Sequence, residues 1–247
     1  MNNLIPLLKN ELVPHQGEYP KYFTPGEIFK ILKVAEEKVI AAKDKKNKRE
    51  KTNADKNLLL IKTLWQTGAR ISELVGNGSA PGLRVKDIDM YGKTVTLQTL
   101  KQKKRKTKPG PMGKNEIPYV VRRIPLQDGL RGDLALYIAA YHREEEDKIF
   151  PISSRRAREI VEKICIEAGI NRVKSHPHAF RHSFAIYCLL NRVPLPTVQK
   201  WLGHSSILNT RIYMEMIAGD VREFYDRIDW ELNSYGPDNL SVQNWRE

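Results

Sequence analysis

The segment that most constrains the architecture runs from Ser175 to Tyr213 and reads SHPHAFRHSFAIYCLLNRVPLPTVQKWLGHSSILNTRIY. Its first part predicts a helix, because Ser175 or His176 can cap it and Pro177 is tolerated in a first turn, where no backbone donor is needed. The apolar positions that would hold this helix in a core are Phe184, Ile186, Cys188, Leu189 and Leu190. We therefore expect the segment to open with a buried helix.

Two more short helices follow in the same segment. Pro194 and Pro196 end the first helix, and a second helix from Thr197 to Leu202 stops at Gly203, the usual residue for a left-handed helix end. A third helix with a serine cap would carry Tyr213 about two turns from its start. The pattern thus predicts three short helices in succession.

Four side chains of this segment suggest phosphodiester chemistry. His178 and Arg181 are three residues apart and project from the same side of a helix, and the following turns supply His204 and Tyr213. An Arg guanidinium binds phosphate through two parallel charge-assisted hydrogen bonds. A Tyr hydroxyl, with an ordinary pKa of about 10, becomes nucleophilic beside a base or a positive field, and His exchanges protons near neutral pH.

These motifs resemble the catalytic core of the tyrosine recombinase, or phage integrase, family. The family pattern is H-x-x-R, then L-G-H, then a Tyr nine residues past that His. This chain has His178-Ala-Phe-Arg181, Leu202-Gly203-His204 and Tyr213. The first arginine box of the family, T-G-x-R-x-S-E-L, is present as Thr67-Gly68-Ala69-Arg70-Ile71-Ser72-Glu73-Leu74. The resemblance covers residues 20 to 230.

The resemblance implies a mainly α-helical (α+β) fold, in which one compact catalytic domain contains a small antiparallel sheet of about three strands. We expect residues 1–20 to be a tail or linker, residues 21–232 to be this domain, and residues 233–247 to be a C-terminal tail. The implied function is site-specific DNA recombination by an integrase of a mobile element, which cleaves and rejoins strands through a 3′-phosphotyrosyl intermediate. Because one ester replaces another, no ATP, metal or other cofactor is expected.

The resemblance also implies a role for each residue of the core motifs. Tyr213 attacks the DNA phosphodiester, while Arg70 and Arg181 hold the non-bridging oxygens as negative charge develops. His178 assists proton transfer from Tyr213, and His204 hydrogen-bonds the phosphate.

A basic hairpin lies between the two arginine motifs. Short half-buried strands are predicted by the alternation in Leu83-x-Val85, Ile88 and Val95-x-Leu97, and by the run Val120 to Leu126. In the family, the turn of this hairpin carries a lysine that protonates the leaving 5′ oxygen. The distance from the strand favours Lys101, with Lys103 as the second choice. The tip also predicts DNA-phosphate contacts, by Lys103, Lys104, Arg105, Lys106 and Lys108.

Composition indicates a DNA-binding protein. The 247 residues are 40% apolar, which fits a globular chain, and the net charge of +13 with a pI near 9.6 favours a polyanion such as double-stranded DNA. Charge that serves solubility alone is the plainer alternative. Cys165 and Cys188 lie in apolar helical patterns, so no disulfide framework is expected. Without an apolar run of about 18 residues or a signal-peptide pattern, we expect a cytoplasmic, nucleoid-associated protein without membrane contact.

Several helices outside the motifs can be predicted. Thr24-Pro25-Gly26-Glu27 has the cap, proline and acidic residue of a helix start. The charge run from Lys43 to Lys56 lacks an apolar anchor, which favours a solvated mobile loop, with DNA-backbone contact as the alternative. Leu58 to Trp65 predict a buried helix that ends at Gly68. Further helices are predicted over residues 130–141, from Ser153 or Ser154 to Gly169, and over residues 221–230, the last docking on its own core or on a neighbouring subunit.

The first 20 residues are too few for the helical clamp domain that usually precedes the catalytic domain in the family. We therefore expect either a minimal protein or a clamp supplied by a separate accessory protein. Contact with one side of DNA allows few base contacts, each worth roughly 1–3 kcal/mol. A monomer in free solution that self-assembles on DNA is the expected behaviour.

Other readings of the motifs are weaker. His178 and His182 have the spacing of zinc ligands on one helix face, but a third ligand is missing nearby, so His182 is expected to be structural. A type IB topoisomerase-like DNA relaxase uses similar chemistry, although the L-G-H box favours a recombinase. A non-catalytic DNA-binding regulator on the same fold is the third alternative, and it has no need of the complete Arg, His, Arg, His and Tyr set.

Overall fold

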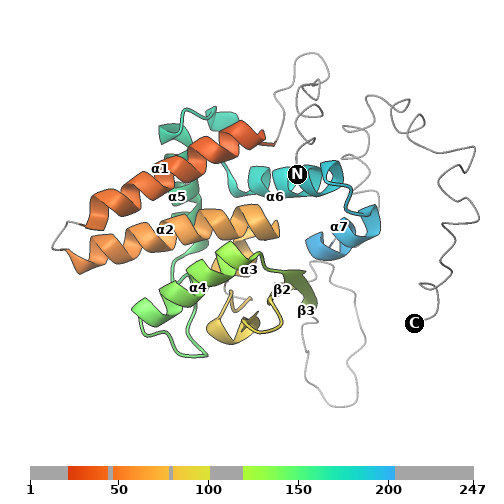
Figure 1. The fold of residues 1–247 in the computed structure, drawn as a ribbon, viewed down its shortest axis with the longest axis horizontal. Coiled ribbons are helices and arrows are strands. Elements are labelled where there is room, and N and C mark those ends of the chain that lie inside the picture. Colours follow the sequence, from red (N-terminus) through yellow and green to blue (C-terminus); the bar gives the residue numbers. More distant parts are fainter. Residues whose placement is uncertain (1–21, 44–46, 78–79, 101–118, 204–247) are drawn as a thin grey trace, which may run out of the picture.

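The computed structural model describes residues 22–43, 47–77, 80–100 and 119–203 of the 247-residue chain. Within these residues, seven α-helices accompany one antiparallel sheet of three strands (Figure 1). The predicted mainly α-helical fold with a small sheet is therefore confirmed.

Two long helices form the centre of the molecule. α1 (Pro25–Lys43) and α2 (Lys48–Thr67) pack side by side in opposite directions (Figure 1). Two further helices pack on α2, and they are α4 (Asp128–Ala140) and α6 (Pro177–Leu190). The C-terminal end of α2 is thereby held against the helix that carries the H-x-x-R motif.

The remaining helices are shorter or lie at the margin. α5 (Ser154–Glu167) packs against α1 and against the five-residue α3 (Ile71–Val75). α7 (Leu195–Leu202) packs against α6 and the last strand of the sheet. The helix starts at Thr24 and Ser153 are confirmed, because the Thr24 and Glu27 side chains accept from each other's backbone N–H groups and Ser153 caps Arg156.

The sheet consists of β1 (Ile88–Asp89), β2 (Thr94–Leu100) and β3 (Tyr119–Pro125), in that order. The register pairs Val95 with Ile124 and Leu97 with Arg122. The predicted strand at Leu83-x-Val85 is wrong, because Val85–Asp87 forms a 3₁₀ turn. Hydrogen bonds to residues outside the sheet hold this segment instead, including Leu83 N–H to the Leu74 carbonyl at 2.9 Å.

The charge run before the buried part of α2 was predicted to be a mobile loop, and from Lys48 onward this prediction is wrong. Asn47 caps α2, its side-chain oxygen accepting from the Arg49 backbone N–H at 3.0 Å. Polar residues of the first turns of α2 are held by hydrogen bonds to other parts of the chain. The Tyr141 hydroxyl donates to the Asp55 carboxylate, and burial together with this bond raises the pKa of Tyr141 to about 12.

The core has one large and one small cluster. The large cluster joins α1 to α6 and the inward side of the sheet, and the small one joins α6 to α7 through Phe184, Ile186, Val198 and Leu202. Cys188, Leu189 and Leu190 only pack at the edge of the small cluster, so their predicted core position is not fully realised.

The two cysteines are free thiols. Among the described residues, no helix combines the length and apolarity needed to cross a bilayer.

Gly68 closes α2 in a left-handed conformation (φ +57°), at a position where a side chain has no room. A Cβ there would lie 2.5 Å from Phe184 Cδ1, whereas at Gly169 (φ +74°) a Cβ would meet no atom within 4 Å. We expect Gly169→Ala to destabilise the fold by about 1 kcal/mol through the backbone alone. Gly68→Ala should cost about 1–3 kcal/mol more through overpacking. Equal urea midpoints for the two variants would contradict this assignment.

Candidate active site

Arg181 joins three segments that are distant in the sequence. It lies on α6, which begins with Pro177. His176 caps this helix, and its Nδ1 accepts a hydrogen bond from the Ala179 N–H at 3.2 Å. The Arg181 side chain is buried, and its guanidinium donates to the Gly68 carbonyl at 2.8 Å and to the Leu202 carbonyl at 2.5 Å. The H-x-x-R motif is therefore bound directly to the first arginine box and to the L-G-H motif.

Arg70 lies two residues beyond the carbonyl that Arg181 contacts. It occupies the N-cap position of α3, and its backbone N–H donates to Glu73 Oε2 at 2.7 Å. The Arg70 guanidinium donates to Glu73 Oε1 at 3.1 Å and remains 29% exposed. The side chain is thus oriented by a buried carboxylate while part of it reaches the surface.

Arg122 is a buried member of this site that the sequence motifs did not indicate. It lies on β3, and its Nε and Nη2 both donate to the Glu73 carboxylate, the former at 3.3 Å. Its Nη1 donates to the Trp201 carbonyl near the end of α7. Burial lowers the pKa of Arg122, and the Glu73 carboxylate partly offsets this effect.

A signal for Arg122 was present in the strand pattern. Residues two apart on a strand face the same side, so Arg122 shares the side of Ile124 and Leu126, which are buried. Val121, one residue before, is instead 60% exposed. An arginine at an inward position of a strand indicates a buried charge that needs a partner.

His178 is accessible at the start of α6, and its surroundings favour the neutral imidazole. Partial removal from water lowers the pKa of His178, and the positive charges of Arg181, His176, Arg70 and Arg158 lower it further. Arg158 on α5 thus lies close enough to act on this histidine, which the sequence did not indicate. At pH 7 the His178 ring can accept a proton.

Several predicted site residues lie outside the part of the chain that the structure describes. They are His204, Tyr213 and the whole hairpin tip, with Lys101, Lys103, Lys104, Arg105, Lys106 and Lys108. The last described residue, Gly203, ends α7 with φ +64°, so the predicted helix stop is confirmed. The predicted start at Thr197 is two residues late, because Leu195 and Pro196 already belong to α7.

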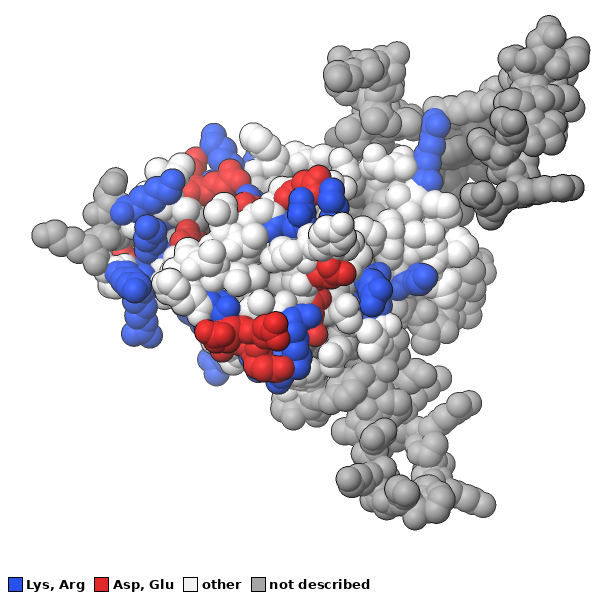
Figure 2. All heavy atoms as spheres, turned by 60° about the horizontal axis from the view of Figure 1, so that its bottom comes forward, with Lys and Arg blue, Asp and Glu red and all other residues white. Residues whose placement is uncertain are grey.

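The described surface carries mixed charge. Figure 2 shows acidic and basic side chains interspersed over the face that it presents. One such group pairs Glu146 with Arg84 and Lys86 at 2.6 and 2.5 Å. By contrast, residues 101–118 contain seven Lys or Arg and one acidic residue, so much of the net charge of +13 resides in the hairpin tip.

The arrangement can bind an anion and exchange a proton. Two guanidinium groups, from Arg70 and Arg181, are anchored at the end of α2, and a neutral imidazole is close enough to be affected by both. Arginine pairs suit the tetrahedral oxygens of a phosphate. Within the described ranges, no group of three His, Cys, Asp or Glu side chains is placed to hold a metal ion.

Comparison with known proteins identifies relatives of the whole described region. The model of the phage integrase family matches residues 21–218. Tyrosine recombinase XerC of Thermodesulfovibrio yellowstonii is 26% identical over 208 residues, 84% of this chain and 62% of that protein. Tyrosine recombinase XerD of Corynebacterium glutamicum is 32% identical over 168 residues, 67% of this chain and 50% of that protein. This chain therefore spans between half and about three fifths of the length of these relatives.

A solved structure agrees in fold. The XerH site-specific recombinase, in a post-cleavage complex with its palindromic difH substrate, has a TM-score of 0.59 to this chain and 21% identity. The match covers 88% of this chain and 56% of that one. At this identity the likeness concerns the fold, and the predicted role of each side chain remains a prediction.

Proposed function

This chain belongs to the phage integrase family, and from that premise we propose that it is a site-specific DNA recombinase of the integrase type. The observation that carries the proposal is the pair of hydrogen bonds from Arg181 to Gly68 and Leu202. These bonds bring three family motifs to one point, the first of them 113 residues before Arg181 and the last 21 residues after it. The motifs joined in this way supply the set Arg70, His178, Arg181, His204 and Tyr213, which a binding protein without catalysis does not need in full.

In the proposed reaction, the Tyr213 oxygen forms a bond to a DNA phosphorus while the bond from that phosphorus to the 5′ oxygen breaks. His178 receives the proton of the Tyr213 hydroxyl, and Lys101 donates a proton to the departing 5′ oxygen. Arg70 and Arg181, with a hydrogen bond from His204, stabilise the charge that develops on the non-bridging oxygens. Attack by a 5′ hydroxyl on the phosphotyrosyl ester reverses these steps and rejoins the strand.

Double-stranded DNA is the proposed partner. The structurally similar XerH was solved with its difH substrate, and the basic composition of this chain suits a polyanion. Exchange between two duplexes cuts four strands, and each cut needs its own tyrosine. We therefore propose that four copies assemble on DNA, with the segment from Val221 to Trp230 among the contacting surfaces. We place the catalytic domain at residues 21–232.

Covalent capture tests the proposed function even though the target sequence is unknown. The protein is incubated with a library of random-sequence duplexes that carry a nick beside the random region, so that cleavage releases a short fragment and traps the adduct. DNA recovered from SDS-resistant adducts defines the site, and peptide mapping identifies the attached residue. A recombinase should enrich one inverted-repeat sequence joined to Tyr213. Absence of any adduct would contradict the proposed activity.

The hairpin tip should provide sequence-independent affinity. Each phosphate contact contributes close to 0.9 units to the slope of log K against log salt. Replacement of Lys103, Lys104, Arg105 and Lys106 by Gln should therefore flatten the slope by up to about 3.6 units and weaken binding to all duplexes alike. Lys101→Ala should instead slow cleavage of the captured site with little change in affinity. Normal cleavage by Lys101→Ala and slow cleavage by Lys103→Ala would transfer the acid role to Lys103.

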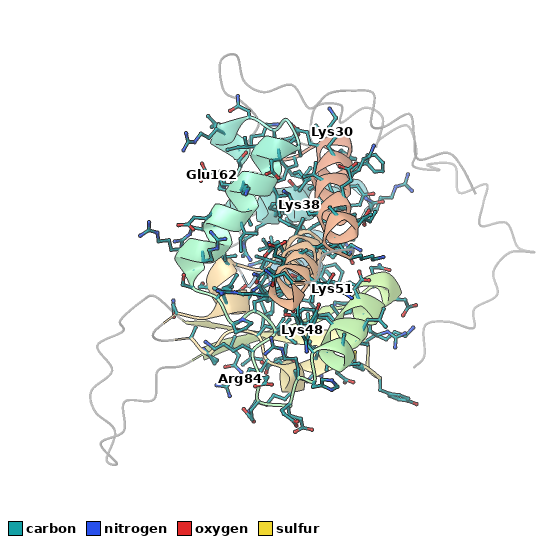
Figure 3. All side chains as sticks on the ribbon, turned by 90° about the vertical axis from the view of Figure 1, so that its left-hand side faces the viewer. Lys30, Lys38, Lys48, Lys51, Arg84 and Glu162 are labelled. Atoms are coloured by element: carbon teal, nitrogen blue, oxygen red, sulfur yellow. The ribbon has the colours of Figure 1, made fainter. Side chains whose placement is uncertain are left out.

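A matched control for the hairpin variant removes four positive charges where α1 ends and α2 begins. Lys43, Lys48, Arg49 and Lys51 are exposed, and Figure 3 shows Lys48 and Lys51 at the end of α2 that faces the viewer. Arg70 follows the opposite end of this 20-residue helix, about 30 Å away. Their replacement by Gln should leave the salt slope nearly unchanged. An equal flattening in both variants would show that charge alone, and not the hairpin, governs binding.

The pH dependence of cleavage should reflect the environment of His178. Its pKa is lowered from the ordinary value of 6.5, so the neutral form that accepts the proton persists below pH 6.5. The acidic limb of single-turnover cleavage should therefore have its midpoint below pH 6.5, at the lowered pKa. Arg158→Gln removes a positive charge that lowers this pKa, so it should shift the acidic limb to higher pH. Coincident limbs in the two proteins would exclude His178 as this base.

A further inference from the structure

A buried ion pair links Arg70, one of the two candidate phosphate-binding arginines, to the end of α7. Glu73 and Arg122 have side chains that are 1% and 2% exposed. The Glu73 carboxylate also binds the backbone and the guanidinium of Arg70, and Arg122 also binds the Trp201 carbonyl. This pair connects three segments that carry the proposed catalytic groups: the strand that follows the hairpin tip, the first arginine box, and the helix before His204.

We propose that Arg122 is a positioning residue for the proposed strand cleavage, on which this inference rests. Arg122 holds Arg70 in place through Glu73, and it holds the exit of α7 through the Trp201 carbonyl. Nε, Nη1 and Nη2 of Arg122 all donate within the protein, to Glu73 and to the Trp201 carbonyl, so we assign Arg122 no contact with DNA. Its effect on cleavage is therefore transmitted through Arg70 and through the segment that begins at His204.

The first part of the role is electrostatic. A carboxylate that paired with Arg70 alone would cancel most of its charge and weaken its attraction for a phosphate. With Arg122 on the same carboxylate, the three groups carry a net charge of +1, and the exposed member is Arg70. Glu73 can thus fix the Arg70 guanidinium in place while the site stays electropositive.

The second part of the role concerns the end of α7. The last carbonyls of a helix have no partner within the helix, and here two of them accept from buried arginines, Trp201 from Arg122 and Leu202 from Arg181. These arginines come from β3 and α6, two elements that are far apart along the chain. The chain then leaves the helix at Gly203, one residue before His204. The last turn of α7 is thus held at two of its carbonyls.

Stability alone is a weak reason for such a pair. Buried ion pairs can often be replaced by apolar residues of similar volume with little loss, or even a gain, of stability. A lysine in place of Arg122 could neutralise Glu73, but one ammonium group cannot reproduce the planar fork that reaches both Glu73 and the Trp201 carbonyl. The geometry therefore points to a function in orientation, which requires arginine in particular.

The test compares Arg122→Lys with Arg84→Lys. Arg84 also binds a carboxylate, that of Glu146 at 2.6 Å, but the Glu146 side chain is 64% exposed, so this pair lies at the surface. On the captured nicked duplex, Arg122→Lys should bind with nearly wild-type affinity and cleave about 100-fold more slowly, because a displacement of about 1 Å costs that much. Arg84→Lys should bind and cleave like the wild type. Addition of methylguanidinium to Arg122→Ala should restore part of the cleavage rate, and methylammonium should not.

The outcomes separate this inference from the proposed function. Wild-type cleavage by Arg122→Lys would overturn the inference, as would a parallel loss of binding, cleavage and melting temperature that methylguanidinium does not relieve. If Arg122→Lys does not fold, the neutral pair Glu73→Gln with Arg122→Met takes its place, and normal cleavage by that folded double variant would overturn the inference.

If the wild type forms no adduct, the recombinase proposal fails, and NMR then tests whether Arg122 positions Arg70 and the end of α7. The Gly203 amide and Arg70 Nε–H signals should shift in Arg122→Lys and not in Arg84→Lys, and unchanged signals would contradict the inference.

Discussion

Tyr213→Phe is expected to abolish the SDS-resistant adduct with the captured duplex completely, while DNA affinity stays within a few-fold of the wild type. The hydroxyl oxygen is the proposed nucleophile, and no other atom of the side chain can form the phosphotyrosyl ester. Phe keeps the aromatic ring and loses only the hydroxyl group. The measurement is single-turnover cleavage with denaturing electrophoresis, together with a binding assay at the same salt concentration.

Two other tyrosines serve as controls for Tyr213. Tyr187 on α6 is 42% exposed, and Tyr225 lies beyond Tyr213 in the sequence. Neither belongs to a family motif, so Tyr187→Phe and Tyr225→Phe should form the adduct at the wild-type rate. An adduct formed by Tyr213→Phe would disprove the assignment of the nucleophile. Loss of the adduct in a control variant instead would transfer the role to that tyrosine.

The fold was largely predictable because local signals and motifs agreed. Caps and stops at Thr24, Ser153, His176 and Gly203 are set by the chain itself, and each lies where it was predicted. Alternation at Val95-x-Leu97 located β2, and the run from Val120 to Leu126 located β3, for the same reason. These features depend on residues within a few positions of one another, so a single sequence carries the information.

The errors concern residues whose partners are distant in the sequence. The charge run after Lys43 was predicted to be a loop because it has no apolar anchor, yet Asp55 is anchored by Tyr141, 86 residues later. Glu73 was recognised as part of a motif, but its partner Arg122 lies 49 residues away. A buried ion pair leaves no periodic pattern in the sequence, apart from the inward strand position of Arg122.

The site itself was predicted in part. The structure brings Arg70, His178 and Arg181 together at the end of α2, although their catalytic roles remain predictions. The choice between Lys101 and Lys103 stays open for a physical reason. A tip with seven basic residues offers several amines of the same chemistry, and only their distance from the leaving oxygen would distinguish them.

Glu73→Ala is expected to be the most destabilising of the substitutions considered. The Glu73 carboxylate is 1% exposed and binds two guanidinium groups and one backbone N–H. Its removal leaves Arg122 as a buried charge without this counterion, and breaking a buried pair in this way costs about 3–5 kcal/mol. The free energy of unfolding, measured with urea, should fall by that amount. The melting temperature should decrease by about 10 °C, as expected for a chain of this length.

Glu146→Ala is the matched control, because it too removes a carboxylate that binds two cations. Glu146 pairs with Arg84 and Lys86, but its side chain is 64% exposed, so water can solvate the cations that remain and the pair contributes little. The unfolding midpoint of Glu146→Ala should match the wild type. If Glu73→Ala unfolds at the same urea concentration as Glu146→Ala, the Glu73–Arg122 pair is not a central element of the fold. Destabilisation of Glu73→Ala alone, relieved when Arg122→Met is added, would locate the cost in the stranded charge of Arg122.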